Sequence, residues 1–472
     1  MALVESNKRS RKLTETSLGT EFAAGENLAE HFGAWASKLS FEDVPEDALI
    51  CARRAVLDTI GVIVAGGQHL GVQALAAHGA GSGGASLAVT GIKTDPITAA
   101  TCNGMAAHVW DFDDNSYTGM IHGSAIILPA VLAVAQSVDA SEKDLLQAFV
   151  IGSEVSYALG EICTHSHFMQ GWWATGSCAL IGTVAGVARL LGLNAEQTAN
   201  AIGTAAVTAG IERAIAGTDA KPYLVGNVAG QAITLARAAQ AGLTGPKDAF
   251  EQKNGFFSLL NQGISKREGI CPLAERWRVQ SPGLLFKTSP VCSAAHAAIE
   301  AASLLTREAT KPLAEVVAIE AEVPKLVSAS LVYDRPVNPQ QAQFSLPYSV
   351  ACAMLHGSVR LQDLSAAELA DDAKQWIMDR VTTRICPELS AEPMASDFPE
   401  STRVTFKYAD GVSRTHFCGE AFGMPNRPLS NGDLIRKFNE CLNFAGLAQH
   451  EIDLQTVDLL ELAAKVLWET AA

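Results

Sequence analysis

A short acidic segment, residues 108–124, holds the side chains of this chain that are best suited to chemistry. It reads HVWDFDDNSYTGMIHGS and contains three carboxylates between two histidines: Asp111, Asp113, Asp114, His108 and His122. Carboxylates this close raise one another's pKa unless a cation, a proton or a metal intervenes. Perturbed carboxylates beside histidines in an apolar setting are typical of general acid/base sites.

The segment has two other interpretations. In the first, it is an ordinary acidic loop that caps a helix, since carboxylates in structural networks also have perturbed pKa values. Alternatively, it is a magnesium site for diphosphate chemistry, since hard cations take several oxygen ligands. Such a site needs a further Asp one helical turn on, where Tyr117 stands, and no second acidic cluster of this kind follows. Proton transfer therefore remains the more specific hypothesis.

Three further segments place basic and phenolic side chains in apolar surroundings. Lys221 lies in TDAKPYLVG, Lys287 and Cys292 lie in FKTSPVCSAAH, and Tyr348 lies in QFSLPYSVAC. In such settings these side chains commonly extend a polar tip to solvent from an apolar stem. They could equally converge on one cleft, where lysines would pair with substrate carboxylates and a His or Tyr would move a proton at the adjacent carbon.

Composition narrows the classes of partner. The 472 residues carry a net charge of −15, and 48% of them are hydrophobic. An acidic surface disfavours nucleic acid and anionic membranes, because both require a basic patch. The ten cysteines are scattered singly, which suits a reducing cytoplasm. The first twenty residues are polar and lack the apolar run of a secretory signal.

The elements that must position these residues change in character along the chain. Helical periodicity dominates from 26 to 270, after a polar tail over 1–25. The alternating run at 316–323 predicts a strand, and Asp410–Gly411 between two β-prone runs predicts a hairpin. We therefore expect an α+β unit over 271–415, and helices again over 416–472, at 431–443 and 452–470. These last helices would pack back on the first bundle.

In this order, the segments resemble the MmgE/PrpD family over nearly the whole chain from about residue 26. The resemblance includes AVLDTIGVIVAG, WDFDDN, GTVAGVARLLGL, AKPYLVGNVAG, FKTSPVCSAAH and FSLPYSVACAML. It implies a mainly α fold, with a large all-helical domain built from both chain termini and a smaller α+β lid domain. It also implies a homodimer that needs no metal or organic cofactor, and activities that include 2-methylcitrate dehydration, cis-aconitate decarboxylation and iminodisuccinate epimerisation.

The same resemblance implies an interdomain site and marks where this chain departs from its relatives. The implied site residues are Asp111, His122, Lys221, Lys287 and Tyr348. Asn115 falls where decarboxylase-like members carry Thr, and Trp173 falls in a segment that often has a His there. Cys292 occupies a position that is either His or Cys in the family. Together with Arg213, in GIERAI, these three are expected to contact the substrate.

The predicted function is a lyase, a dehydratase or decarboxylase, acting on a small anionic di- or tricarboxylate. Lys221 and Lys287 would neutralise its carboxylates, and His122 would move the proton. Asp111 would orient His122, and Tyr348 would donate to a leaving group or to an intermediate. Asp113 and Asp114 are expected to have supporting roles. The alternatives are an epimerase of an iminodisuccinate-like acid, through the same carbanion, and a non-catalytic dimeric homologue.

Overall fold

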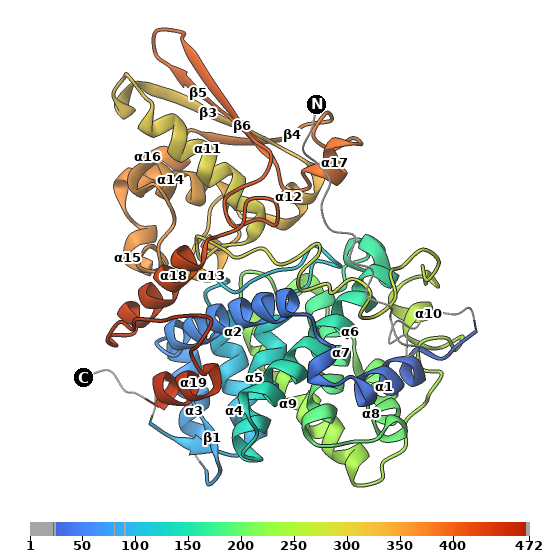
Figure 1. The fold of residues 1–472 in the computed structure, drawn as a ribbon. Helices are drawn as coiled ribbons and strands as arrows, with labels where there is room; N and C mark the ends of the chain where they lie inside the picture. Colours follow the sequence, from blue (N-terminus) through green and yellow to red (C-terminus); the bar gives the residue numbers. More distant parts are fainter. Residues whose placement is uncertain (1–21, 23–24, 80, 89–90, 469–472) are drawn as a thin grey trace, which may run out of the picture.

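Two lobes make up the protein, one almost entirely helical and one built around a small sheet (Figure 1). The computed structural model describes residues 22, 25–79, 81–88 and 91–468, so most of the predicted tail over 1–25 lies outside the described residues. The prediction of a mainly α fold is confirmed, because helices dominate the described residues and strands form only small sheets.

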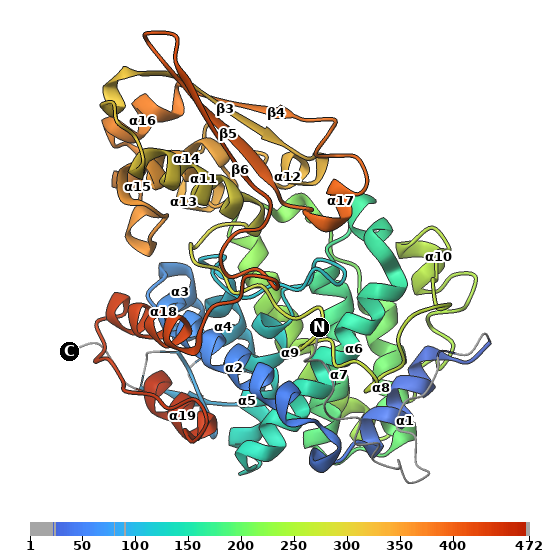
Figure 2. The same ribbon diagram turned by 45° about the horizontal axis from the view of Figure 1, so that its top comes forward.

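The helical lobe draws its helices from both ends of the described chain. Its first part contains α1 (Leu28–Lys38), α2 (Glu46–Gly66), α3 (Leu70–His78), α4 (Pro96–His108), α5 (Ser124–Ser137), α6 (Glu142–Met169), α7 (Ala174–Leu190), α8 (Ala195–Thr208), α9 (Ala220–Gln240) and α10 (Phe256–Leu260). A two-stranded antiparallel sheet of β1 (Ala85–Ser86) and β2 (Lys93–Thr94) lies between α3 and α4. After the second lobe the chain returns as α18 (Asn431–Phe444), which packs on α2, and α19 (Leu459–Trp468), which packs on α2 and α6 (Figures 1 and 2).

Local sequence signals explain where the site-bearing helices begin. Asp95 caps α4 by accepting hydrogen bonds from two backbone N–H groups of the first turn, and Pro96 occupies the first helical position. α4 and α9 then pack closely, because a Cβ on Gly226 would lie 2.0 Å from the Thr101 carbonyl oxygen. Only glycine permits this approach, which brings the start of α9 and its Lys221 to the end of α4 and its His108.

The second lobe, which we call the lid lobe, surrounds a four-stranded sheet of order β4-β3-β5-β6. Only β3 and β4 are parallel; the other two pairs are antiparallel. Its elements are α11 (His296–Arg307), β3 (Val316–Val323), α12 (Lys325–Ser330), α13 (Pro339–Ala342), α14 (Leu346–His356), α15 (Ala366–Leu369), α16 (Asp372–Met378), β4 (Val381–Ile385), α17 (Met394–Asp397), β5 (Thr402–Tyr408) and β6 (Ser413–Cys418). The predicted strand and hairpin are both present, with Gly411 at φ 84° in the turn.

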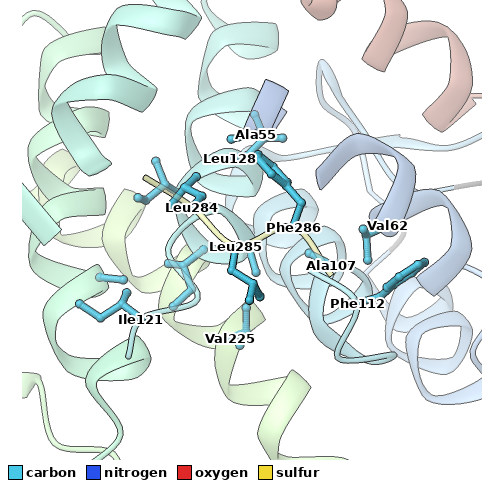
Figure 3. Close-up of a cluster of buried hydrophobic side chains, with 14 of the residues drawn as sticks. Ala55, Val62, Ala107, Phe112, Ile121, Leu128, Val225, Leu284, Leu285 and Phe286 are labelled. Atoms are coloured by element: carbon cyan, nitrogen blue, oxygen red, sulfur yellow. The ribbon is translucent and has the colours of Figure 1, made fainter. Parts of the chain in front are cut away.

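A buried apolar cluster supports the loop between α4 and α5, which contains the acidic segment. Phe112 and Ile121 from this loop pack with residues of α2, α4, α5 and α9, and with the segment Leu284–Phe286 (Figure 3). The backbones of Asn115 and Leu285 exchange two hydrogen bonds, of 3.0 and 2.8 Å. The core thus fixes the acidic loop against the segment that ends at Lys287.

The C-terminal helices also hold this loop. On α18, the Lys437 ammonium pairs with Asp58 of α2 at 2.8 Å and donates to the Phe112 carbonyl oxygen at 2.8 Å. The last predicted helix, 452–470, begins later than expected, at Leu459, because residues 452–458 are irregular apart from one turn over 454–456; residues 469 and 470 lie outside the described residues. Within the described ranges, no helix combines the length and the apolar character needed to cross a bilayer.

Candidate active site

A cavity of about 150 Å³ lies where the two lobes meet. A cavity of this size can hold a small ring such as benzene. Its walls include Asp111 and His122 from the acidic loop and Lys221 from α9 of the helical lobe, and Phe344 and Glu400 from the lid lobe. The predicted residues Asn115, Trp173, Arg213 and Cys292 also line it.

Asp111 lies between two lysines at the base of this cavity. Its Oδ1 accepts from Lys221 Nζ at 2.7 Å and its Oδ2 from Lys287 Nζ at 3.0 Å. Burial, the largest influence on the pKa of Asp111, raises it, but the two ammonium groups outweigh burial and hold that pKa well below its usual range. The positive φ of Asp111, 48°, turns its carbonyl oxygen to Lys287 as well. The three groups therefore carry a net charge of +1.

Lys287 was predicted to neutralise a substrate carboxylate, but its position does not allow this. Its side chain is fully buried behind Asp111 and is not part of the cavity wall. Burial, the largest single influence, lowers the pKa of Lys287, but Asp111, Asp113 and Cys292 together outweigh it and raise that pKa. Lys287 thus stays charged and fixes Asp111, and the substrate-facing ammonium is that of Lys221.

A chain of hydrogen bonds joins Lys221 to His122. Lys221 Nζ donates to Nε2 of His108, and His108 Nδ1 donates to Asp113 at 2.9 Å. Asp113 Oδ2 in turn accepts from His122 Nδ1 at 3.0 Å. Asp113, and not Asp111 as predicted, is therefore the carboxylate that orients His122. Burial would raise the pKa of Asp113, but the two histidines together lower it well below its usual range.

These contacts assign the protons of both imidazoles. An ammonium only donates, so His108 Nε2 must be an acceptor and its proton must lie on Nδ1. The ionised Asp113 only accepts, so His122 also carries its proton on Nδ1. Burial lowers the pKa of His122, which keeps the ring neutral. Its Nε2 has no hydrogen-bond partner among the described residues, and the side chain is 12% exposed toward the cavity. His122 Nε2 is thus available as a base.

Two cations face the cavity. The Lys221 ammonium lies 5.4 Å from the ring centroid of Trp173 and 5.2 Å from that of Phe344, and its bonds to Asp111 and His108 leave one N–H free. Arg213 donates to two backbone carbonyls and stacks on Phe168, with no carboxylate partner in the part of the chain that the structure describes. Burial lowers the pKa of Arg213. An anionic ligand in the cavity could therefore pair with both the Lys221 ammonium and the Arg213 guanidinium.

Several polar groups of the cavity wall are neutral or acidic. Burial raises the pKa of the Cys292 thiol to about 12, so it stays protonated. Asn115 Nδ2 makes a long contact of 3.5 Å to Ser293 Oγ. Glu400 accepts from Ser293 Oγ at 2.8 Å and from the hydroxyl of Tyr117 at 2.9 Å. Burial raises the pKa of Glu400.

Tyr348 does not reach this cavity, contrary to its predicted role. It lies on α14, and its hydroxyl donates to the Asp363 backbone carbonyl oxygen inside the lid lobe. Lys374 Nζ lies 3.4 Å from the same hydroxyl and also pairs with Asp363. Burial raises the pKa of Tyr348 far above its usual value. Its hydroxyl belongs to a buried network of the lid lobe.

The acidic loop is poorly suited to a metal ion. Four groups that could ligate a metal lie within 4.8 Å of one another, namely His108, Asp111, Asp113 and His122. Both oxygens of each carboxylate already accept hydrogen bonds, and both nitrogens of His108 are bonded. Two ammonium groups adjoin the cluster and would repel a cation. The donor set therefore disfavours a metal ion.

Some residues of the site were missed by the sequence analysis. Glu400 lies in none of the segments singled out from the sequence, and Ser293, although it follows Cys292 in FKTSPVCSAAH, was not picked out. The Tyr117–Glu400 hydrogen bond spans 283 positions, so no local pattern indicates it. His108 and Asp113 had the right chemistry for the site, but their contacts depend on the positive φ of Asp111, which the spacing of the acidic loop does not reveal.

The sequence of this chain matches the two domains of one known protein family. The MmgE/PrpD N-terminal domain matches residues 30–268 and the MmgE/PrpD C-terminal domain matches residues 289–462. The chain belongs to the MmgE/PrpD family, as its motifs predicted.

Three curated relatives are cis-aconitate decarboxylases. The Homo sapiens protein is 26% identical over 429 residues, covering 87% of both chains. The Mus musculus protein is 24% identical over 427 residues, covering 87% of this chain and 86% of its own. The protein of Aspergillus terreus (strain NIH 2624 / FGSC A1156) is 24% identical over 458 residues, covering 91% of both chains.

Proposed function

We propose that this protein is a cofactor-independent lyase, a dehydratase or decarboxylase, acting on a small di- or tricarboxylate. The observation that carries the proposal is the arrangement of three groups in one interlobe cavity: a neutral imidazole with a free Nε2, His122, beside two cations, Lys221 and Arg213. The cations suit substrate carboxylates, and the imidazole suits a proton next to one of them.

The proposed first step is removal of a proton from the carbon beside a bound carboxylate. His122 Nε2 takes the proton, and Asp113 stabilises the imidazolium through its hydrogen bond to Nδ1. The electron pair spreads into the carboxylate, whose growing charge Lys221 neutralises from a fixed position. Fixed charges in a buried site are an effective source of such stabilisation. In a dehydration, hydroxide then leaves the adjacent carbon and a double bond forms.

A decarboxylation uses the same groups in a different order. Carbon dioxide leaves and the electron pair stays on carbon. His122, after taking a proton from solvent on Nε2, then delivers that proton to the carbon. The matched relatives named cis-aconitate decarboxylases support a carboxylate substrate of this size. Trp173 bears on the choice of reaction, because an indole donates a hydrogen bond but cannot transfer a proton by titrating as a histidine does.

A proton NMR screen in heavy water tests the proposal. Candidate acids, including citrate, malate and cis-aconitate, are incubated with the purified protein. A new vinyl signal from a saturated acid indicates elimination, and loss of a carboxylate with uptake of deuterium indicates decarboxylation. Deuterium uptake without net conversion would instead support the epimerase alternative. No exchange and no conversion with any acid that binds would support the non-catalytic homologue.

His122→Gln tests the assigned base. The variant should lose at least about a hundredfold in turnover, in line with a typical general base. Its melting temperature should stay close to that of the wild type, because the glutamine amide is similar in size and can still donate to Asp113. Full turnover by His122→Gln would contradict the mechanism.

We also propose that the protein works as a homodimer in the cytoplasm, without a nucleic-acid or membrane partner. The net charge of −15 and the scattered free cysteines support the compartment and the lack of anionic partners. Exposed apolar side chains on the helical lobe, among them Leu70 at 80% exposed, would suit a subunit interface. Light scattering coupled to gel filtration tests the dimer, and a monomeric mass at micromolar concentration would contradict it.

A further inference from the structure

Glu400 brings a second carboxyl group into the cavity, one that the mechanism above does not use. It lies in the lid lobe just before β5 and is only 2% exposed. Two hydroxyls, those of Tyr117 and Ser293, donate one hydrogen bond to each of its oxygens. A carboxylate offers about four acceptor positions, so two donors leave Glu400 with lone pairs free on the cavity wall.

Asn115 supplies a second acceptor beside Glu400. Its Nδ2 contacts Ser293 Oγ, which links it to Glu400 through one hydroxyl. Its Oδ1 is buried and has no hydrogen-bond partner in the described parts of the chain. An unpaired buried carbonyl oxygen is costly, and such groups in folded proteins call for an explanation. Because Asn115 lines the cavity, a ligand is in position to supply the missing donor.

The acceptor oxygens of Glu400 and Asn115 restrict the chemistry of a ligand that fits the cavity. Ionised carboxylates offer only acceptors, so they pair with Lys221 and Arg213 but are repelled by Glu400 and leave Asn115 Oδ1 unpaired. A hydroxyl or imino proton can be shared between the two oxygens in a three-centre hydrogen bond, and an amino nitrogen can donate a separate N–H to each. We infer that Glu400 and Asn115 form a subsite for a hydrogen-bond donor of the substrate, which makes the substrate a hydroxy, amino or imino acid. This inference rests on the proposed function, because it assumes a carboxylate held by the two cations.

A purely structural role for Glu400 must be separated from this one. Its hydrogen bond to Tyr117 joins the lid lobe to the acidic loop of the helical lobe, and that contact alone could hold the lobes together. Tyr117→Phe removes the interlobe hydrogen bond and keeps the Glu400 carboxylate. Glu400→Gln keeps the shape and weakens the acceptor. The two variants therefore divide the structural role from the recognition role.

Matched pairs of acids provide the test. Citrate and tricarballylate carry the same three carboxylates, but only citrate has a hydroxyl; malate and succinate form the corresponding dicarboxylate pair. Isothermal titration calorimetry measures their dissociation constants with the wild type, Glu400→Gln, Asn115→Leu and Tyr117→Phe. Melting temperatures of all four proteins show that each variant is folded.

The wild type should bind the hydroxy acid of a pair at least about tenfold more tightly, the value of one well-made hydrogen bond to a charged acceptor. Glu400→Gln and Asn115→Leu should each reduce that preference to roughly twofold or less, since the shared hydroxyl proton loses one of its two acceptors or its charged one. Tyr117→Phe should keep it. The ratio within a pair isolates the hydroxyl, because any general loosening of the site weakens both acids.

The outcomes separate the subsite from the function on which it rests. Equal binding of both members of each pair by the wild type would overturn the subsite and leave the carboxylate function standing. An undiminished preference in both Glu400→Gln and Asn115→Leu would also overturn the assignment. No binding of any of the four acids, with a folded protein, would overturn the proposed function and the subsite together.

Discussion

Replacing Asp113 by Asn offers a direct test of how the proposed base is prepared. His108 Nε2 accepts from the Lys221 ammonium, so its Nδ1 must keep its proton and must donate to residue 113. In Asp113→Asn the amide oxygen is therefore taken by His108, and the amide N–H₂ faces His122 Nδ1. His122 must then accept at Nδ1 and carry its proton on Nε2, where the base is needed.

The size of the effect follows from the hydrogen bonds involved. Restoring the original tautomer of His122 would set two N–H groups against each other, which costs about 1–3 kcal/mol in a buried site. Loss of the charged partner of the imidazolium removes a further ~1.5–3 kcal/mol. At 1.36 kcal/mol per factor of ten, we expect turnover to fall roughly 10²- to 10⁴-fold.

Turnover is measured by NMR with whichever acid the screen identifies, and the tautomer is measured by ¹⁵N NMR of histidine-labelled protein. Asp114→Asn is the matched control. Burial raises the pKa of Asp114 well above its usual range, which favours the neutral form of that carboxyl group. It also contacts Ser124 and neither histidine. The control should keep nearly full activity. An unprotonated His122 Nε2 in Asp113→Asn, or wild-type turnover, would refute the reasoning.

Four further outcomes are expected. Lys437→Met should lower the free energy of unfolding, measured in urea, by about 3–5 kcal/mol, because it leaves Asp58 as an unpaired buried charge. Adding Asp58→Asn to this variant should recover much of the loss. Additive losses in the double variant would contradict the pairing. Burial lowers the pKa of His108 from 6.5 to about 4, so the folded state binds fewer protons than the unfolded state between these values. His108 should therefore contribute up to about 3 kcal/mol to the fall in the free energy of unfolding as pH drops from 6.5 to 4. A fall of the same size in His108→Gln as in the wild type would contradict this origin. Arg213→Gln should raise KM for a carboxylate about tenfold or more with a smaller change in kcat, and an unchanged KM would remove Arg213 from substrate binding. Tyr348→Phe should keep kcat/KM within roughly twofold, since its hydroxyl bonds inside the lid lobe; a large loss of kcat would restore its catalytic role.

The features predicted correctly from the sequence are those with local causes. The capping boxes at Ser141–Asp144 and Asn194–Gln197 start α6 and α8, because side chain and backbone meet within one turn. The alternation at 316–323 and the Asp410–Gly411 dipeptide also act over a few residues and gave β3 and the β5–β6 hairpin. For such elements the chain's own periodicity is sufficient.

The site was harder to predict because its contacts are distant or depend on one backbone angle. The residue types in the acidic loop were informative, and four of the substrate-contact residues do line the cavity. The roles of Asp111 and Asp113 were exchanged, since the positive φ of Asp111 decides which carboxylate meets the lysines. Tyr348 was wrongly predicted to line the site. Its hydroxyl donates to a backbone carbonyl oxygen elsewhere in the lid lobe, a contact that no local pattern indicates.

The contact of Lys437 with the Phe112 carbonyl has a consequence for how the protein is made. The acidic loop emerges from the ribosome more than three hundred residues before α18, the helix that holds it and covers α2. Contacts of such sequence separation form late, after the intervening chain has been ordered. During synthesis, the apolar face of α2 therefore stays uncovered until the lid lobe and then α18 have been translated. A chain shortened before residue 431 should expose that face and depend on chaperones, even though every residue of the cavity wall is already present.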